Sequence, residues 1–485
     1  MQPRTRITIQ NNALGILPPQ FGSLLALAGV ATGGTINLPQ SFGTVKAVRD
    51  TLIGGPLAEA AAHAIERYGN AVVCVPTGAS DAAAHAPPVK TGTGTSVVTV
   101  TGAPTDDFEI FVAITEAGPT GVLAVGTAGI ELQWSRDNGR TMSAATALGT
   151  ELQFEIPGTG LTLVFGVGTL AEGDTIYVSC TAAEWNATEL GDAMAVLAAS
   201  QIDWQILQVV GQLTASDATT IDAKFAGYAA AGRFRMWIGS ARIPNVGETD
   251  AAYQTVLAGA WGHVALEYGS ICAGAELLSS SLTSEAFLRP ISIMFAPWLA
   301  HLSEEIDAAA LNLGPVPGTI YDDNGNLIPR CHDETITPGL DDMRFTCLRS
   351  WASYAGTYVN NPRMLSAQGS DFKYCQARRV INIAATVLQQ YFDWRLSVPV
   401  AIDTKTGKLL EEEAAEMDKG ATAAMASALT AKPKASGVKC VVSRDDNILS
   451  TELIHVTARV VPLGYPKAID IDLAFENPAN NVVAA

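Results

Sequence analysis

The chain has 485 residues, which is too long for one ordinary hydrophobic core and predicts two to four domains. Its formal net charge of −18 repels phosphate backbones and disfavours nucleic acid as a partner. Only 16% of the residues are charged and 48% are hydrophobic, so we expect other protein to cover much of the surface.

Nothing in the sequence predicts insertion into a membrane. The longest uncharged stretch starts at Phe21, but Gly33 and Gly34 interrupt it and its apolar centre is short. A secretory signal peptide also fits poorly, because polar and proline residues separate Arg6 from this stretch. We therefore expect the protein to be made in a cytoplasm.

Residues 1–20 predict an extended N-terminal arm. Thr5, Ile7 and Ile9 alternate with polar residues, so they would share one face of a strand. A pair of prolines then interrupts regular structure. No obvious hairpin partner stands beside this strand in the sequence.

Residues 21–88 together with 184–345 predict an α/β domain. A helix is expected over 55–69, with Pro56 in its first turn and Gly69 at its end. Strands that alternate with helices along a chain usually form a mostly parallel sheet. The expected strands are 23–29, 71–76, 204–211, 233–241 and 263–269, and the further expected helices are 187–201, 217–232 and 251–262.

Residues 89–183 predict an all-β domain inserted into the α/β region. Short alternating segments recur between turn residues without a helix, as in a β-sandwich or barrel. A segment over 77–94, rich in alanine, glycine and proline, predicts a linker before them. The six expected strands are 96–102, 107–114, 130–135, 152–158, 161–166 and 174–180.

Residues 346–466 predict an α+β C-terminal domain. Helices are expected over 371–396 and 407–431, and strands over 437–444 and 452–463. The apolar stripe expected on the first helix consists of Ala377, Val380, Ile381, Ala384, Leu388 and Tyr391.

Residues 467–485 predict a C-terminal arm that contains a well-patterned strand. One face of this strand carries Asp470 and Asp472, and the other face is apolar. From the residues alone, pairing within the same chain and pairing with another molecule are equally compatible with the pattern. The apolar face consists of Ile469, Ile471, Leu473 and Phe475.

Seven cysteines are scattered along the chain, and none forms a C-x-x-C pair. An odd, dispersed set does not predict an internal disulfide framework. We expect most of them to be buried as small hydrophobic residues, and disulfides between subunits are the alternative. They are Cys74, Cys180, Cys272, Cys331, Cys347, Cys375 and Cys440.

No segment provides a complete catalytic or metal-binding template. The stretch from Ser270 to Gly274 resembles a nucleophile elbow around Cys272, but it lacks the first glycine of that motif. Cys331 and His332 offer metal ligands, yet no second ligand pair stands at a usual spacing. We therefore expect no enzymatic activity, no cofactor and no metal site.

Two other functions remain open at this point. A hydrolase-like α/β enzyme could use Cys272 or His263, with the β domain as an accessory module. A glycan-binding protein could use residues 95–182. The acidic run over 411–419 is typical of a solvated helix face, and a docking surface is the alternative.

Several segments in order along the chain resemble the sheath proteins of contractile phage tails and related injection machines. This likeness includes an α/β opening over residues 14–35 and 45–76. It also includes the segment TGTGTSVVTVTGAP (91–104). The more specific matches are CLRSWASYAGTYVNNPRMLSAQGSDFKYCQARRVINIAA (347–385), SGVKCVVSRDDNILST (436–451) and VPLGYPKAIDIDLAFENPA (461–479).

The resemblance implies a structural subunit without enzymatic activity. In such sheaths, N- and C-terminal arms leave their own subunit and add strands to sheets of neighbouring subunits. The implied donated strands contain Thr5, Ile7, Ile9, Ile469, Ile471, Leu473 and Phe475, and the implied receiving sheet contains Val438, Val441, Val456, Ala458 and Val460.

The resemblance also implies partners and a location. Copies of the chain would form stacked sixfold rings around an inner tube protein and meet baseplate and tail terminator proteins. The C-terminal domain would face the tube, and the inserted β domain would lie on the outer surface. The implied location is the tail sheath of a virion assembled in the host cytoplasm. Candidate tube-facing residues are Lys405, Lys408, Glu411 and Glu412.

Overall fold

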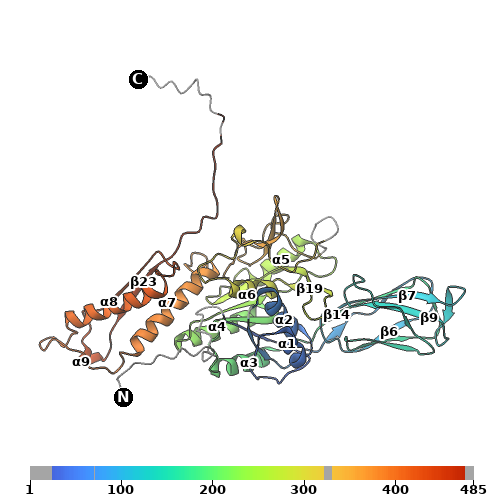
Figure 1. The fold of residues 1–485 in the computed structure, drawn as a ribbon, viewed down its shortest axis with the longest axis horizontal. Coiled ribbons are helices and arrows are strands. Elements are labelled where there is room, and N and C mark those ends of the chain that lie inside the picture. Colours follow the sequence, from blue (N-terminus) through green and yellow to red (C-terminus); the bar gives the residue numbers. More distant parts are fainter. Residues whose placement is uncertain (1–23, 70, 322–329, 474, 476–485) are drawn as a thin grey trace, which may run out of the picture. The chain divides into compact units, whose positions relative to one another are not determined.

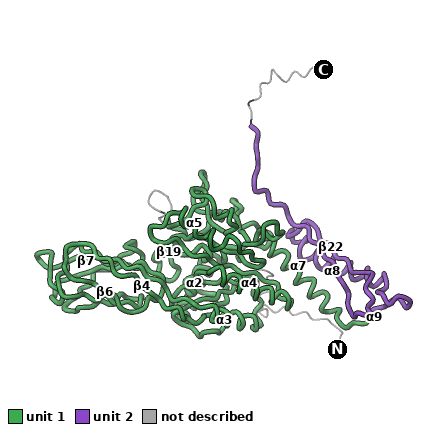
Figure 2. Tube along the Cα trace, turned by 180° about the vertical axis from the view of Figure 1, so that it is seen from behind, with its two compact units in different colours: residues 1–399 green, residues 400–485 purple. Residues whose placement is uncertain are grey.

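The computed structural model describes residues 24–69, 71–321, 330–473 and 475. The chain forms two compact units, Met1–Pro399 and Val400–Ala485, which have different colours in Figure 2. The predicted N-terminal arm, residues 1–20, lies outside the described residues.

Six of the described strands form a mostly parallel sheet at the centre of the first unit (Figure 1). They are β1 (Leu25–Gly29), β2 (Gln40–Phe42), β3 (Val72–Pro76), β15 (Ile206–Gln212), β16 (Met236–Ser240) and β17 (Gly269–Cys272). The parallel strands run in the order β17-β16-β15-β1-β3, which confirms the predicted parallel sheet. Strand β2 closes the edge antiparallel to β3.

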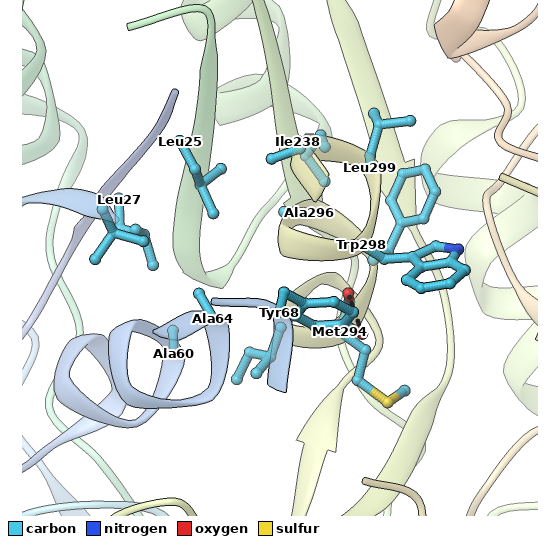
Figure 3. Close-up of a cluster of buried hydrophobic side chains, with 14 of the residues drawn as sticks. Leu25, Leu27, Ala60, Ala64, Tyr68, Ile238, Met294, Ala296, Trp298 and Leu299 are labelled. Atoms are coloured by element: carbon cyan, nitrogen blue, oxygen red, sulfur yellow. Dashed lines mark hydrogen bonds between the residues drawn. The ribbon is translucent and has the colours of Figure 1, made fainter. Parts of the chain in front are cut away.

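Helices cover both faces of this sheet. Side chains of successive residues in β1 point to opposite faces, so each face has its own hydrophobic core. Leu25 and Leu27 pack on the side of α2 (Pro56–Tyr68) and α6 (Ser292–His301), and Figure 3 shows this cluster. The intervening Ala26 lies in the other core. The helices that contribute to the other core are α3 (Ala187–Ala199), α4 (Ala215–Ala230) and α5 (Asp250–Trp261).

Helix α2 has the limits that its sequence predicts. Pro56 occupies the first turn, where the missing N–H is no loss. Gly69 ends the helix in the left-handed region, with φ at 67°, and its N–H donates to the carbonyl of Ile65 at 3.0 Å. Several buried alanines give this helix a small cross-section, so its backbone can lie close to the sheet.

The α/β core differs from the prediction at two points. The sequence analysis does not anticipate helix α1 (Val45–Leu52). The strand expected over 263–269 is wrong, because β17 begins only at the last residue of that segment. The carboxylate of Asp222 accepts the N–H groups of Glu267 and Tyr268, both at 2.8 Å, so a strand ladder cannot use them.

The segment between β3 and α3 forms an all-β body with its own hydrophobic core. Its strands are β4 (Ala84–His85), β5 (Val89–Thr91), β6 (Val98–Gly102), β7 (Glu109–Ala117), β8 (Val122–Ala124), β9 (Ile130–Ser135), β10 (Thr146–Ala147), β11 (Gln153–Ile156), β12 (Leu161–Phe165), β13 (Thr169–Ala171) and β14 (Thr175–Thr181). Side chains from the sheets β10-β9-β7-β14-β4 and β11-β12-β6 fill that core.

The six strands predicted for this body are present as β6, β7, β9, β11, β12 and β14. The linker expected over 77–94 is wrong in part, because it contains β4 and β5. Both of these short strands pair with β14. Strand β14 thus provides backbone hydrogen-bond partners that the local sequence of the segment does not reveal.

A buried ion pair joins the β body to a hairpin of the α/β core. The hairpin consists of β18 (Ala275–Ser279) and β19 (Ala286–Pro290). The guanidinium of Arg289 donates to both carboxylate oxygens of Asp106, at 2.9 and 2.7 Å, and both side chains are buried. A bidentate arginine–carboxylate pair is strongly directional, so this contact fixes the β body against the core.

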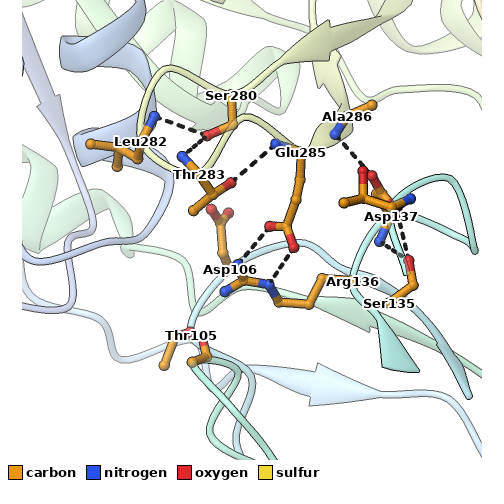
Figure 4. A network of polar contacts seen from close by, with 12 residues as sticks. Thr105, Asp106, Ser135, Arg136, Asp137, Ser280, Leu282, Thr283, Glu285 and Ala286 are labelled. Atoms are coloured by element: carbon orange, nitrogen blue, oxygen red, sulfur yellow. Dashed lines mark hydrogen bonds and ion pairs between the residues drawn. The ribbon is translucent and has the colours of Figure 1, made fainter. Parts of the chain in front are cut away.

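Further polar contacts lie beside this ion pair and hold the same hairpin (Figure 4). Arg136 of the β body pairs with Glu285 at 2.6 Å. The carboxylate of Asp137 accepts the N–H of Ala286 at 3.2 Å. Because both contacts reach the start of β19, the β body is attached at several points of one hairpin.

The first unit also contains β20 (Leu348–Trp351), β21 (Tyr354–Val359) and α7 (Cys375–Asp393). These elements lie within the C-terminal domain predicted to begin at residue 346. The boundary between the compact units instead follows α7, after Pro399.

The buried face of α7 is more polar than its periodicity predicts. Val380 and Ala384 of the expected stripe are buried, but so is Arg379. The guanidinium of Arg379 donates at 2.8 Å to the carbonyl of Leu302, which caps the C-terminal end of α6 and has no partner within that helix. The half-buried members of the stripe are Ala377, Ile381, Leu388 and Tyr391.

The second unit has an α+β fold. Helix α8 (Glu411–Ala428) packs on β22 (Gly437–Val442), which pairs antiparallel with β23 (Val456–Val461), and α9 (Ile448–Thr451) lies in the connection. These elements confirm the helix and the two strands predicted here. The buried side chains of α8 are Ala414, Met417, Ala421 and Met425.

Replacement of Arg289 by methionine should destabilise the protein by about 3–5 kcal/mol, because the Asp106 carboxylate would stay buried without its partner. Chemical denaturation followed by circular dichroism measures this loss. The control is Lys46→Ala, which removes an exposed ion pair with Asp50 and should change little. Similar stability of the two variants would contradict the role of the Arg289–Asp106 pair.

Candidate functional site

The receiving sheet implied by the sequence resemblance is the β22–β23 pair of the second unit. Val438 lies opposite Val460 and Cys440 lies opposite Ala458 in its register. Because side chains alternate along a strand, these four residues share the face that packs on α8. Val441 projects to the other face, where it is exposed.

Helix α8 covers β22 more completely than β23. On β22, the side chains of Cys440 and Val442 are buried. On β23, Ala458 stands directly opposite Cys440 and yet is exposed. The apolar face of this small sheet therefore extends beyond the helix, on the side of β23.

The outer edge of β22 is already hydrogen-bonded to α8. The N–H of Cys440 donates to the hydroxyl of Thr422 at 3.0 Å. The N–H of Val442 donates to the carboxylate of Asp418 at 2.6 Å. Both N–H groups therefore point away from β23, and both already have a partner.

The outer edge of β23 is free within the described part of the chain. Opposite residues of an antiparallel pair point their N–H groups the same way, either toward each other or both outward. Since Cys440 and Val442 point outward, so do Ala458 and Val456 opposite them, and Val460 follows by alternation. None of these three outward N–H groups donates to another described residue. Such an edge is a template for a further strand.

Residues 468–473 of the C-terminal arm follow β23 and pair with no described strand. Residues 467–473 lie outside any helix or strand, and Figure 1 shows them leading away from β23. The side chains of Ile469, Ile471 and Leu473 are 76%, 79% and 93% exposed, and Phe475 is fully exposed. Exposure of several apolar side chains to water is unfavourable, so a protein surface that covers them would be stabilising.

The other predicted site residues are distributed as follows. Thr5, Ile7 and Ile9 lie outside the described residues. Among the candidates for contact with a tube, Lys408 pairs with Asp445 at 2.9 Å and Glu411 pairs with Arg444 at 3.1 Å. Lys405 and Glu412 are exposed on the same unit.

Arg444 fastens the start of α8 to the edge of β22. Its guanidinium pairs with Asp418 at 2.7 Å as well as with Glu411. Burial acts to raise the pKa of the Asp418 carboxyl, but hydrogen bonds from Arg444 and from the N–H of Val442 hold that pKa below its usual value. Asp418 is therefore charged at neutral pH and closes this edge of the sheet, a role that the sequence analysis missed.

The alternative nucleophile, Cys272, is poorly placed for catalysis. It lies fully buried in β17, and this burial raises the pKa of its thiol well above the usual value. An activated cysteine needs the opposite, an accessible thiol with a lowered pKa. No hydrogen bond or ion pair joins it to His263, which lines an open hollow of the first unit with Arg344 and Lys373.

The seven cysteines, which all belong to the described part of the chain, are free thiols. All but Cys331 are buried, as predicted, and Cys331 is half-buried. Within the same described residues, no group of three or more histidine, cysteine or acidic side chains is arranged to hold a metal ion. No helix in this part of the chain is both long and apolar enough to cross a bilayer.

Replacement of Asp418 by asparagine should destabilise the second unit by about 1–2 kcal/mol at pH 7, because charged hydrogen bonds to Arg444 and Val442 weaken. The carboxylate has a lower pKa in the folded state than in the unfolded state. Its contribution is therefore present above about pH 4 and is lost as the pH falls through the folded-state pKa. Hydrogen exchange of β22 at pH 3 and pH 7 measures both effects.

Glu412→Gln is the matched control, since Glu412 lies exposed on the same helix. It should leave the exchange of β22 unchanged at both pH values. Protection of β22 that did not differ between Asp418→Asn and the wild type at pH 7 would contradict the edge-closing role of Asp418.

No protein-family model and no curated protein matches this chain. Among solved structures, a sheath tail protein from Listeria innocua aligns with 92% of this chain and 97% of its own, at 10% identity and a TM-score of 0.45. A sheath tail protein from Desulfitobacterium hafniense aligns with 95% of this chain and 100% of its own, at 11% identity and a TM-score of 0.45.

A chain from the anti-feeding prophage baseplate in its contracted state aligns with 98% of this chain and 98% of its own, at 12% identity and a TM-score of 0.48. Identities and scores in this range are too low to carry function from these structures to the present chain.

Proposed function

We propose that this chain is a structural subunit of a contractile sheath and polymerises by exchange of terminal strands. The observation that supports this proposal is the combination, within the described residues of one chain, of a strand edge on β23 without a partner strand and an exposed, strand-patterned segment at 468–473 that belongs to no sheet. The β23 edge has no partner strand, and the arm segment has no sheet to pair with. If the arm of one copy binds the β23 edge of another copy, the backbone groups of both segments gain hydrogen-bond partners.

The geometry of the link favours exchange over pairing within one chain. The residues between β23 and the arm include Pro462 and Pro466, which hold φ near the extended value and carry no N–H. In the described structure residues 462–466 belong to no helix or strand, and the chain after them does not return along β23 as a hairpin (Figure 2). The arm of one copy therefore reaches outward, where it meets the β23 edge of another copy.

Strand addition supplies both the affinity and the geometry of such a polymer. Outward N–H and C=O groups of β23 would form a new ladder, and the alternate side chains of the arm would continue the apolar face beside α8. Full burial of one large aliphatic or aromatic side chain contributes roughly 1.5–3 kcal/mol, so several of them can offset the ordering of the arm.

A contact in which one surface of a copy binds a different surface of the next builds rings or open helical polymers. The extended arm also lets two rigid bodies move while their shared ladder stays intact. Both properties are what stacked sixfold rings of a contracting sheath require, as the tube is driven through a target envelope. The chain would act mechanically and not as an enzyme.

The finer assignments belong to the same proposal. The strand with Thr5, Ile7 and Ile9 would be a second donated strand, added beyond the first because α8 occupies the outer edge of β22. Residues 346–466 would face an inner tube, with Lys405 and Glu412 among the contacts, and the β body at 89–183 would lie outside. Baseplate and tail terminator proteins would be further partners in a virion tail assembled in a host cytoplasm.

Removal of residues 468–485 should give a folded monomer that no longer polymerises, because the free edge of β23 then receives no strand. Size-exclusion chromatography and negative-stain microscopy of the purified protein distinguish tubes from monomers. Removal of residues 1–12 tests the second arm in the same way.

The matched control is a shorter deletion, residues 480–485, which leaves the patterned strand in place and should still assemble. The proposal fails if the protein without residues 468–485 forms tubes like the full-length chain.

A further inference from the structure

The outer face of the β22–β23 pair carries two like charges directly opposite each other. Lys439 of β22 and Arg459 of β23 are partners in the register, and both are exposed. Neither side chain forms an ion pair or a hydrogen bond with another described residue. Like charges opposite each other destabilise a sheet. Asp418 of α8 interacts electrostatically with Lys439, so Arg459 is the member of the pair that lacks an acidic partner among the described residues.

The C-terminal arm carries acids in the matching place. Asp470 and Asp472 alternate with the apolar residues Ile469, Ile471 and Leu473. When the apolar residues join the face that packs on α8, the alternation of side chains puts both carboxylates on the opposite face. That is the face of Lys439 and Arg459, and this holds for either direction of the added strand.

The ladder geometry brings Arg459 close to such an acid. The outward N–H groups of β23 belong to Val456, Ala458 and Val460, so these residues would make the new hydrogen bonds. In an antiparallel ladder, Arg459 then stands in a pair without hydrogen bonds, where the Cα atoms approach to about 4.5 Å. A second carboxylate two residues away lies on a diagonal of about 7–8 Å, still within reach of a long arginine side chain.

We propose that Arg459, with Lys439 beside it, is the receptor for Asp470 and Asp472 on the arm of a second copy. This inference rests on the strand exchange proposed above, and it adds which residues of the receiving sheet recognise the arm. The pairing determines which face of the arm turns toward α8. A slip by one residue would place a carboxylate on the apolar face and leave Arg459 against an aliphatic side chain.

Charge reversal in the full-length chain tests the receptor. Arg459→Glu alone, and Asp470→Lys/Asp472→Lys alone, should each raise the critical concentration for assembly by about tenfold or more, a change equivalent to about 1.4 kcal/mol. An equimolar mixture of the two proteins should assemble again, because each arm then meets an acceptor of opposite charge. Light scattering and microscopy follow the assembly.

Lys432→Glu makes the same change in charge at an exposed position of this unit outside the sheet. It should assemble like the wild type, which separates pairing from net charge.

Cysteine cross-linking tests the register. Cα atoms at the expected separation suit a disulfide, so Arg459→Cys combined with Asp470→Cys or with Asp472→Cys should form oligomers on a non-reducing gel. Arg459→Cys combined with Ile471→Cys is the control, since these side chains would lie on opposite faces and should not cross-link.

The outcomes distinguish the receptor from the strand exchange itself. Assembly by the protein without residues 468–485 would overturn the exchange. If that truncation stops assembly but Arg459→Glu assembles like the wild type, or the charge-reversed mixture stays monomeric, the exchange stands and the receptor is wrong. Cross-links through Ile471→Cys instead of the two aspartate positions would also overturn the receptor.

Discussion

Within the described part of the chain, the outer edge of β23 has no partner strand, and this is the constraint on which the second unit depends. Backbone N–H and C=O groups must find partners, and α8 provides them only for β22, through Thr422 and Asp418. The helix therefore closes one side of a small sheet and leaves the other side open. An open side of this kind gives the unit a direction, so that strands can be added on one edge alone.

The first unit differs, because contacts within the chain join its central sheet, its hairpin and its inserted β body. Strand β2 covers β3, and the β body is held on one hairpin by the buried pair of Arg289 and Asp106. Under the proposed strand exchange, a first unit joined by internal contacts and a second unit with an open strand edge would suit a subunit that keeps its own shape while its connections to neighbours change.

The sequence predicted the parts whose signals are local. Pro56 and Gly69 marked α2, and alternation of side chains marked the strands of the β body and the apolar face of the arm. It could not predict contacts that join distant residues. The carboxylate of Asp222 replaces a strand at 267–268, Arg379 adds a buried charge to α7, and Asp418 closes β22 from another element. The exposure of Ala458 likewise depends on how far α8 reaches over the sheet.

The link that contains Pro462 and Pro466 would, under the proposed strand exchange, have a consequence for the supply of subunits in the cell. A chain that folded its own tail onto its own sheet would be complete and inert, and every such molecule would be withdrawn from growth. Under the proposed strand exchange, a link that disfavours this pairing within one chain would keep newly made chains able to bind one another. The same exposed strand edge would also promote non-specific aggregation, so ordered assembly would have to be faster than aggregation.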